Sequence, residues 1–381
     1  MTRHQLTFLQ QIDSLQFPSS PCSDSRILLY TPHACGLGAE LHWLTVALQL
    51  AIVTRRQLVI REDVPWIYAE APFCPPGHGT FSCYFRPLSA CLVRSDADLL
   101  TLLAADRSST TAAAAMRRVP IVSSADLLAH ADARVVQWTT DLQQQLDFKF
   151  TRTVPRDWHA RLLPFHSTVS DLFWWRSQLV GYVWRFSPRV DAILAERRRD
   201  TLPPAAHADD AVLIGVHSRS GDKVFGSGLQ PAEMREVDAS WKVAMIEAVA
   251  TRCASEVGVE RFTAAFVATK DPQTLAVLSG AVSTSVPLIW DTSIHRYGRG
   301  FSTEDLVKGT LNRTQEALDA LSDVDILSRC AGKCFLVGSS FPRPMHRTSC
   351  TDVPSFGQII VSQRFPRRRF GSHNSHPFFG P

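Results

Sequence analysis

The chain has 381 residues, which at about 150 residues per domain predicts two domains. Hydrophobic residues make up 45 % and charged residues 20 % of it, so a disordered or collagen-like chain is excluded. The net charge of +4 is too small for general nucleic-acid binding, and we expect any anion site to be local. No run of about 18 apolar residues predicts a membrane span, and the first 18 residues lack the layout of a signal peptide.

Short apolar runs alternate with longer segments of helical period, which predicts an α/β fold with parallel sheets. The expected strands are residues 26–30, 57–60, 135–138, 211–217, 263–269, 286–291 and 334–338. The expected helices are residues 39–53, 169–186 continuing to 199, 241–257 and 311–330.

Domain boundaries follow from one proline-containing stretch. The segment 201–210, TLPPAAHADD, comes just before a strongly apolar strand and predicts an interdomain linker. We expect an N-terminal extension over residues 1–25, a first domain over 26–200, a second domain over 211–345 and a loose C-terminal tail over 346–381. The basic run in that tail is interpreted as solvated, with nucleic-acid contact as the alternative.

The chain has nine cysteines, and five of them fall in its first quarter. This clustering predicts disulfides and an oxidising compartment, with buried free thiols as the alternative. The odd number leaves at least one thiol unpaired. No spacing resembles a zinc module.

The first candidate site is a glycine turn, CGLGAELH, between a predicted strand and a predicted helix. Gly36 and Gly38 permit a tight turn and let a ligand approach the backbone N–H groups at the start of the helix. The alternative is a plain structural connection, because the third glycine of a dinucleotide fingerprint is missing.

The second candidate site follows the apolar strand 211–216, which leads directly into His217, Arg219, Asp222 and Lys223. Ligands bind at the carboxyl ends of strands in open α/β sheets. The guanidinium of Arg219 offers a planar fork suited to a diphosphate, and Lys223 adds a point charge. The alternative is an ion pair of Asp222 with one of these cations.

The third candidate is Asp271, in VATKDP, where an apolar strand ends and a helix begins. The alternative is a helix N-cap.

The fourth candidate comprises Asp323 and the hydroxyls of Ser339 and Ser340, which follow the last predicted strand. These hydroxyls can bind phosphate oxygens or cap a helix. Asp323 and Asp325 also form an Asp-x-Asp pair, but helical periodicity would splay the two carboxylates, so we expect no metal site there.

Together these segments resemble the α1,6-fucosyltransferase family, which core-fucosylates N-glycans and has rhizobial relatives acting on chitooligosaccharides. The resemblance runs from about residue 26 to 343, and five motifs occur in the family's order. They are CGLGAELHWL, FWWRSQLVGYVWRFSPRVDAIL, GVHSRSGDKV, VATKDP, and DVDILSRC with FLVGSSFPR. The resemblance implies a GT-B-like fold of two facing Rossmann-like domains. It also implies that the second domain holds most of GDP-fucose and that the sugar is inverted without a metal or other cofactor.

The resemblance also assigns roles. It implies that Arg219 clamps the β-phosphate of the donor and that Lys223 assists near the leaving group or the acceptor. His217 and Asp222 would shape the same loop. The remaining donor contacts it implies are Asp271, Asp323, Ser339 and Ser340.

The residue that corresponds to the family's general base depends on the register of the loop. In the family, this base is a glutamate shortly after the signature lysine. The simple register places Ser227 there, whereas an insertion in the loop makes Glu233 the counterpart, with Glu236 in reserve. The chain departs from the family pattern at Ser220 for a second arginine, Lys270 for an aspartate and Ala39 for a cysteine.

The expected activity is transfer of fucose from GDP-fucose to the 6-hydroxyl of an N-acetylglucosamine in an N-glycan or chitooligosaccharide-like acceptor. One alternative is an O-fucosyltransferase or another nucleotide-sugar transferase, and another is an inactive homologue that retains GDP-sugar binding. The expected partners are GDP-fucose and a glycan or glycoprotein. The resemblance implies location in the Golgi or secretory-pathway lumen.

Overall fold

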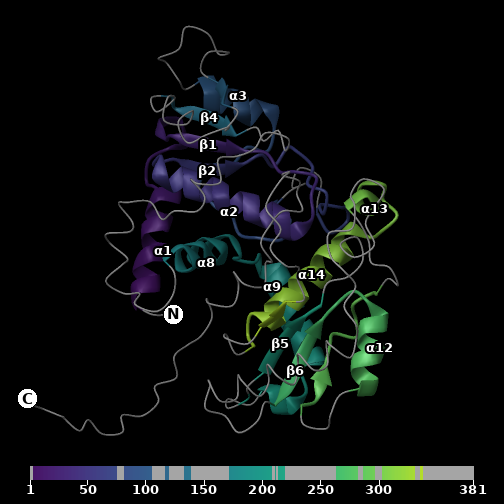
Figure 1. Cartoon of the computed structure of the whole chain (residues 1–381). Coiled ribbons are helices and arrows are strands. Elements are labelled where there is room, and N and C mark those ends of the chain that lie inside the picture. Colours follow the sequence, from purple (N-terminus) through teal and green to yellow (C-terminus); the bar gives the residue numbers. More distant parts are fainter. Residues whose placement is uncertain are drawn as a thin grey trace, which may run out of the picture.

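The computed structural model describes residues 3–74, 81–104, 116–119, 133–138, 171–207, 211, 213–218, 263–281, 286–296, 303–330 and 335–337. These residues form two parallel four-stranded sheets with helices packed around them (Figure 1). The predicted α/β class is therefore confirmed. The predicted helix 241–257 and the predicted tail 346–381 lie outside the described residues.

The first sheet has the strand order β2-β1-β4-β3, and every neighbouring pair is parallel. Its strands are β1 (Ile27–Tyr30), β2 (Gln57–Ile60), β3 (Met116–Val119) and β4 (Val135–Trp138). All residues of β1, β2 and β4 are buried, because a parallel sheet is covered on both faces. This burial explains the mostly apolar runs that predicted these three strands. β3 is not among the predicted strands.

Helices cover both faces of the first sheet (Figure 1). They are α1 (Arg3–Gln16), α2 (Leu37–Val53), α3 (Asp96–Ala104) and α8 (Asp171–Val183). Leu29 and Val135 point to one face and pack with Leu99 of α3. Tyr30 and Val136 point to the other face, into the larger core that α1, α2 and α8 share.

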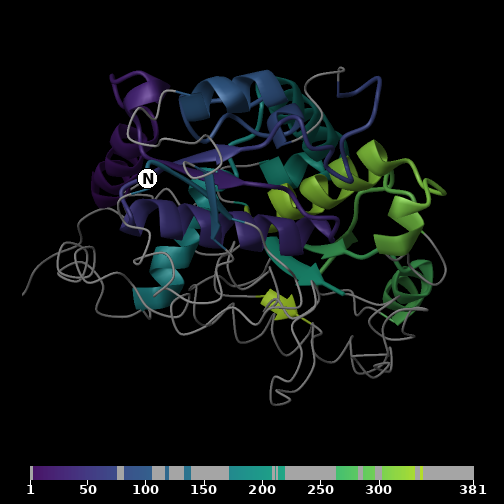
Figure 2. The ribbon, with the colours of Figure 1, turned by 90° about the horizontal axis from the view of Figure 1, so that it is seen from above.

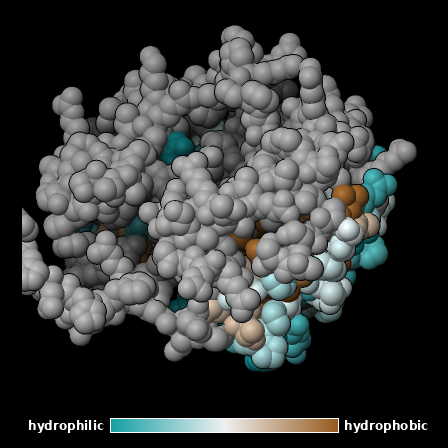
Figure 3. Space-filling view, turned by 60° about the horizontal axis from the view of Figure 1, so that its bottom comes forward, coloured by the Kyte–Doolittle hydropathy of each residue, from teal (hydrophilic) through white to brown (hydrophobic). Residues whose placement is uncertain are grey.

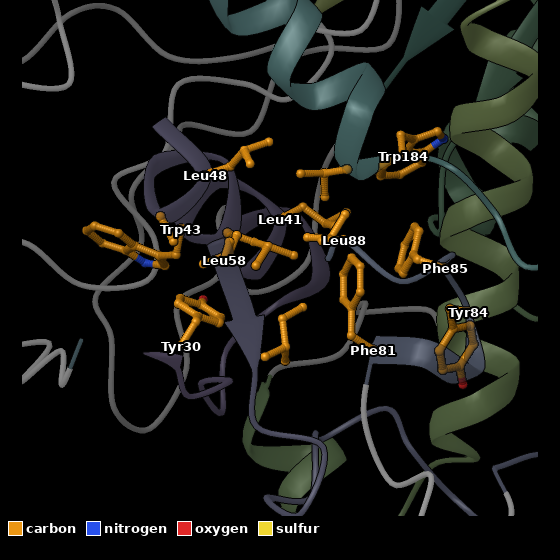
Figure 4. Close-up of a cluster of buried hydrophobic side chains, with 14 of the residues drawn as sticks. Tyr30, Leu41, Trp43, Leu48, Leu58, Phe81, Tyr84, Phe85, Leu88 and Trp184 are labelled. Carbon is orange, nitrogen blue, oxygen red and sulfur yellow. The ribbon is translucent and has the colours of Figure 1, made fainter. Parts of the chain in front are cut away.

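The larger core is rich in aromatic side chains (Figure 4). The rings of Phe81 and Phe85 stack with centroids 4.2 Å apart, and Trp184 packs against Phe85 at 5.8 Å. Tyr30 meets Trp138 edge to face at 5.5 Å. Offset and edge-to-face aromatic pairs stabilise a core beyond their buried area, so this cluster fixes the first sheet against its helices.

Helix α1 lies within the predicted N-terminal extension, and residues of its later turns pack into this core. Phe8 and Ile12 of α1 are 1 % and 0 % exposed. The side chain of Gln16 donates to the carbonyl of Arg56 and accepts from the backbone N–H of Leu58. Phe8 and Ile12 are four residues apart, which places both side chains on the same face of α1.

The predicted long helix breaks into two, which corrects the expected continuation to residue 199. α8 ends at Val183, and α9 (Pro188–Thr201) begins after a short extended stretch in which Phe186 bridges to Phe85. Ser187 caps α9 by accepting from the N–H of Val190 at 3.4 Å, and Pro188 occupies the first turn. Proline has no N–H to donate to the preceding turn, so a helix begins there more readily than it continues.

The second sheet has the order β7-β6-β5-β8 and is also parallel. Its strands are β5 (Leu213–His217), β6 (Ala264–Ala268), β7 (Leu288–Ile289) and β8 (Phe335–Val337). The accompanying helices are α12 (Pro272–Ala281), α13 (Thr303–Val307) and α14 (Arg313–Leu327). The predicted linker is partly packed, because Leu202 and Ala206 join the core of this sheet.

Helix α14 contacts both halves of the structure (Figures 1 and 2). Leu318 and Leu321 are buried in the larger core beside the first sheet, whereas Ile326 and Leu327 are buried in the core of the second sheet. An ion pair of 2.9 Å joins Asp319 of α14 to Arg197 of α9. α14 therefore fixes the two sheets relative to one another.

Gly215 in β5 packs tightly against the segment that ends α14. A Cβ atom there would lie 3.0 Å from Cδ2 of Leu327 and 3.2 Å from Cβ of Cys330. Gly215→Ala should lower the free energy of unfolding by about 1–2 kcal/mol, because overpacking a filled core forces its neighbours to shift. Denaturant titration measures this. Gly280→Ala is the control, because nothing lies within 4 Å of its Cβ position, and it should leave stability unchanged or slightly higher.

The predicted disulfides in the first quarter of the chain are confirmed. They join Cys22 to Cys91 and Cys74 to Cys83. Cys35 and Cys330 are buried thiols that take no part in a disulfide among the described residues. The compartment in which the chain resides stays a prediction.

The described part of the surface is mixed in character, as Figure 3 shows for one face. The large apolar side chains exposed among the described residues come from different segments, namely Phe17, Leu92, Leu100, Val277 and Val307. Single exposed apolar residues are ordinary in folded proteins. Of the helices described, none has both the length and the apolar character to cross a bilayer.

Candidate active site at the strand ends

The polar side chains that the sequence singles out follow the carboxyl ends of parallel strands. The glycine turn follows β1, and His217 ends β5. Lys270 and Asp271 follow β6. Ligands of open α/β folds bind at such ends, so the two carboxyl edges are the candidate site.

The edge of the second sheet is joined to the first half of α14 by Lys270. Its ammonium Nζ lies 2.7 Å from Oδ2 of Asp319 and 3.1 Å from Oε2 of Glu316. Both carboxylates are buried, and Asp319 also accepts from Gln315 and pairs with Arg197. Lys270, which departs from the family pattern, is therefore committed to two acidic side chains of α14.

The edge of the first sheet lies against the same half of α14. The backbone N–H of Leu37, which begins α2, donates to the hydroxyl of Tyr68 at 2.9 Å. Tyr84 donates to the carbonyl of Tyr68 at 2.7 Å, and the backbone N–H of Arg313, which begins α14, donates to Glu70 of the same segment at 3.2 Å. Both carboxyl edges therefore contact one helix, which gives the candidate site a rigid wall.

Asp271 has the local role that the sequence left open as an alternative. Its Oδ1 accepts from the N–H of Gln273 at 2.9 Å, and its Oδ2 accepts from the hydroxyl of Thr274 at 2.6 Å. Both contacts lie in the first turn of α12, so Asp271 caps that helix. Its predicted contact with a nucleotide stays a prediction.

Asp291 is a buried carboxylate near this edge that the sequence analysis does not single out. It is 2 % exposed, and it accepts from the backbone and hydroxyl of Ser293 and from the hydroxyl of Ser322. Arg296 donates to its carbonyl oxygen. The available signal was its position at the end of the predicted strand 286–291.

Asp323 is the sequence-predicted carboxylate whose environment is most unusual. The residue keeps some solvent contact, but its Oδ1 is buried and has no hydrogen-bond partner among the described residues. Burial raises the pKa of Asp323 from 3.8 to about 8, against the opposing charge of Lys270. Asp323 therefore carries a proton at neutral pH in the unliganded protein, and it can donate a hydrogen bond as well as accept one.

This shift gives a testable pH dependence. Between about pH 4 and pH 8 the unfolded chain loses the Asp323 proton while the folded chain keeps it, so stability falls as pH rises through this window. Asp323→Asn cannot ionise in either state. The unfolding free energy of the wild type should therefore decline relative to that of Asp323→Asn from pH 4 to pH 8. If the unfolding free energy of the wild type stays constant or rises relative to that of Asp323→Asn over this range, the raised pKa of Asp323 is contradicted.

Asp323 and Asp325 both lie in α14, as the helical periodicity predicted. Asp325 is taken up by ion pairs with Arg198 and Arg329. Its surroundings are therefore unlike those of Asp323. Across the residues that the structure describes, no cluster of three or more His, Cys, Asp or Glu side chains is arranged to hold a metal ion.

Of the residues predicted to form the signature loop after β5, the structure describes His217. It is partly buried at the end of β5. The predicted site residues outside the described residues are Arg219, Asp222, Lys223, Glu233, Ser339 and Ser340, together with the reserve base Glu236. Their roles stay predictions.

The glycine turn leaves open space at the start of α2. Gly36 is the N-cap residue. Within the part of the chain that the structure describes, no side chain caps the helix and nothing lies within 4 Å of the Cβ position of Gly36. Its φ of −58° is accessible to any residue, so room for a neighbour, rather than backbone strain, is what Gly36 provides here. Gly38 lies in the first turn of α2.

A buried carboxylate that the sequence analysis missed holds this turn. Glu40 is 1 % exposed and accepts from the hydroxyl of Tyr30 at 2.9 Å and from the N–H of His33 at 3.0 Å. The Sγ atom of Cys35 lies 3.6 Å from Glu40 Oε2. The only signal in the sequence was a charged residue in an otherwise apolar helix.

The two parallel sheets, with polar side chains at their carboxyl ends, agree with the predicted GT-B-like fold of two Rossmann-like domains. A family model described as the N- and catalytic domains of alpha-(1,6)-fucosyltransferase matches residues 3–279. The chain belongs to the α-(1,6)-fucosyltransferase family and is a glycosyltransferase. The match ends before Asp323, Ser339 and Ser340, so their assignments rest on the sequence motifs alone.

Solved structures of fucosyltransferases are similar to this chain at low identity. NodZ alpha-1,6-fucosyltransferase soaked with GDP-fucose is 17 % identical with a TM-score of 0.38, and the match covers 81 % of this chain and 87 % of that one. NodZ from Bradyrhizobium gives the same values. An Arabidopsis thaliana FUT1 variant in complex with GDP is 12 % identical with a TM-score of 0.48, covering 85 % and 72 % of the two chains. No curated protein matches the chain.

Proposed function

We propose that this chain transfers fucose from GDP-fucose to the 6-hydroxyl of an N-acetylglucosamine in an N-glycan or chitooligosaccharide-like acceptor. The observation that carries the proposal is the family match over residues 3–279, which includes the signature HSRSGDK. The contact of both strand-end edges with α14 supports it, because such an arrangement suits a donor bound at one edge and an acceptor at the other.

The donor is held mainly by the second half of the chain. Arg219 clamps the β-phosphate, and His217 and Asp222 shape its loop. Asp323 lies near the guanine or ribose, where its unpartnered Oδ1 is available to a ligand. The other proposed contacts are Asp271, Ser339, Ser340 and the glycine turn at Gly36 and Gly38.

The reaction inverts the configuration of the sugar and uses no metal. The acceptor oxygen forms a bond to the anomeric carbon as the bond to GDP breaks, and Glu233 takes the proton of the acceptor hydroxyl. The charge that develops on GDP is stabilised by Arg219 and backbone N–H groups, with Lys223 assisting. Fixed donors of this kind supply the stabilisation that a divalent cation provides elsewhere.

The proposed setting is the Golgi or secretory-pathway lumen. The two disulfides of the first quarter of the chain support it, because disulfides persist in oxidising compartments.

A turnover assay tests the proposal. The purified chain is incubated with GDP-fucose and a panel of N-glycan, chitooligosaccharide and peptide acceptors, with and without EDTA, and GDP release is measured. We expect release only with acceptors that contain N-acetylglucosamine, and no effect of EDTA. Transfer to a peptide hydroxyl would instead indicate an O-fucosyltransferase, and GDP binding without turnover an inactive homologue. Glu233→Gln should lower kcat while leaving the GDP dissociation constant unchanged.

A further inference from the structure

The carboxylate of Glu40 connects both ends of the turn between β1 and α2. Tyr30 is the last residue of β1, His33 lies within the turn, and Cys35 comes just before Gly36. All three approach the one carboxylate, and Nδ1 of His33 lies 3.3 Å from Oε2. A buried carboxylate that accepts several hydrogen bonds is expensive to leave unpaired, so the turn and Glu40 hold one another in place.

The ring of His33 adds a further contact to this group. Its Nδ1 lies 3.3 Å from Glu40 Oε2 and 3.0 Å from the hydroxyl of Tyr30. The strand end, the turn and the first turn of α2 are therefore connected through one set of polar side chains.

The turn that Glu40 holds is the open part of the first sheet's edge. No described atom lies within 4 Å of the Cβ position of Gly36, and the hydroxyl of Tyr68 accepts a hydrogen bond from the N–H of Leu37. A shift of the main chain before Gly36 would move these groups relative to α14, whose first residue Arg313 donates to Glu70, two residues after Tyr68. The position of the turn at the site thus depends on the contacts of Glu40.

We propose that Glu40 is a positioning residue for the donor site, which fixes the turn through Tyr30, His33 and Cys35. This inference rests on the proposed function, because the turn is assigned there to the GDP-fucose site. Glu40 does not touch the donor, and it acts only through the main chain of the turn.

The test uses three variants and a matched control. Glu40→Ala removes the acceptor, Tyr30→Phe removes one donor and keeps the ring, and Glu40→Gln keeps an acceptor of the same shape. Thr45→Val is the control, because Thr45 is also buried on α2 but donates only to the carbonyl of Leu41. The first readout is the labelling rate of Cys35 by a maleimide, resolved by peptide mass spectrometry, with Cys330 as the internal reference. The second is the dissociation constant of GDP.

We expect Glu40→Ala to speed Cys35 labelling and to weaken GDP binding by about tenfold, which corresponds to about 1.4 kcal/mol. Tyr30→Phe should do both to a smaller extent, while Glu40→Gln and Thr45→Val remain near the wild type. If Glu40→Ala misfolds, Tyr30→Phe decides.

Unchanged Cys35 labelling in Glu40→Ala and Tyr30→Phe would overturn the positioning role. Faster labelling with unchanged GDP affinity would overturn the link between the turn and the donor, while the proposed function stood. An equal loss of affinity in Thr45→Val would show general loosening of α2 and would also overturn the inference. Failure of the proposed function is recognised separately, because the wild type itself would then not bind GDP.

Discussion

Arg219→Ala should lower kcat/KM for fucosyl transfer by about 10²–10³-fold, because one charged donor to the leaving group is lost. In the proposed site Arg219 is the only guanidinium of the signature, since Ser220 occupies the position of the family's second arginine. No neighbouring cation of the same motif can form the paired bonds that its fork makes to a diphosphate. The measurement is initial rates over a range of GDP-fucose concentrations with a saturating acceptor.

Two further variants make the Arg219 result specific. Arg219→Lys keeps the charge but loses the fork, so it should recover only part of the rate. Arg329→Ala removes an arginine whose side chain is 38 % exposed and paired with Asp325, and it should leave the rate unchanged. A wild-type rate for Arg219→Ala would contradict the donor site.

Asp319→Ala should lower the free energy of unfolding by about 3 kcal/mol, because it removes the carboxylate that pairs with Arg197 and leaves Lys270 with Glu316 as its ion-pair partner among the described residues. Asp319 is fully buried and pairs with both Lys270 and Arg197, whose side chains are 20 % and 14 % exposed. These cations keep some solvent contact, which places the expected loss at the low end for a broken buried ion pair. The measurement is denaturant titration at neutral pH.

A surface ion pair provides the comparison for Asp319. Arg329→Ala leaves Asp325 paired with Arg198, so it should cost less than about 1 kcal/mol. If Asp319→Ala costs no more than Arg329→Ala, the link between α9, α14 and Lys270 does not stabilise the protein.

The sequence predicted those strands whose own residues reveal that they are buried. β1 and β6 are buried on both faces, so each is a run of apolar or aromatic residues that can be recognised without its neighbours. α1 was missed because its apolar residues, among them the buried Phe8 and Ile12, alternate with polar residues in a short segment. Pro188 marks the break between α8 and α9 in the sequence. The helical periodicity on both sides of it nevertheless predicted one continuous helix.

The contacts of the site are non-local, and this is why the sequence could not supply them. Lys270 pairs with Asp319, 49 residues later, and Asp291 bonds to Ser322, 31 residues later. Sequence periodicity assigns a residue to a face of its own element, but it does not identify the partner on another. The role of Glu40 was missed for a related reason, because its donors come from the strand and the turn before its helix.

Calorimetry of GDP binding tests the central claim most directly. The purified wild-type chain is titrated with GDP in EDTA and again with manganese. We predict binding of the same affinity under both conditions, and its loss in Arg219→Ala. No binding of GDP, or binding that requires manganese, would contradict a metal-free donor site built on Arg219.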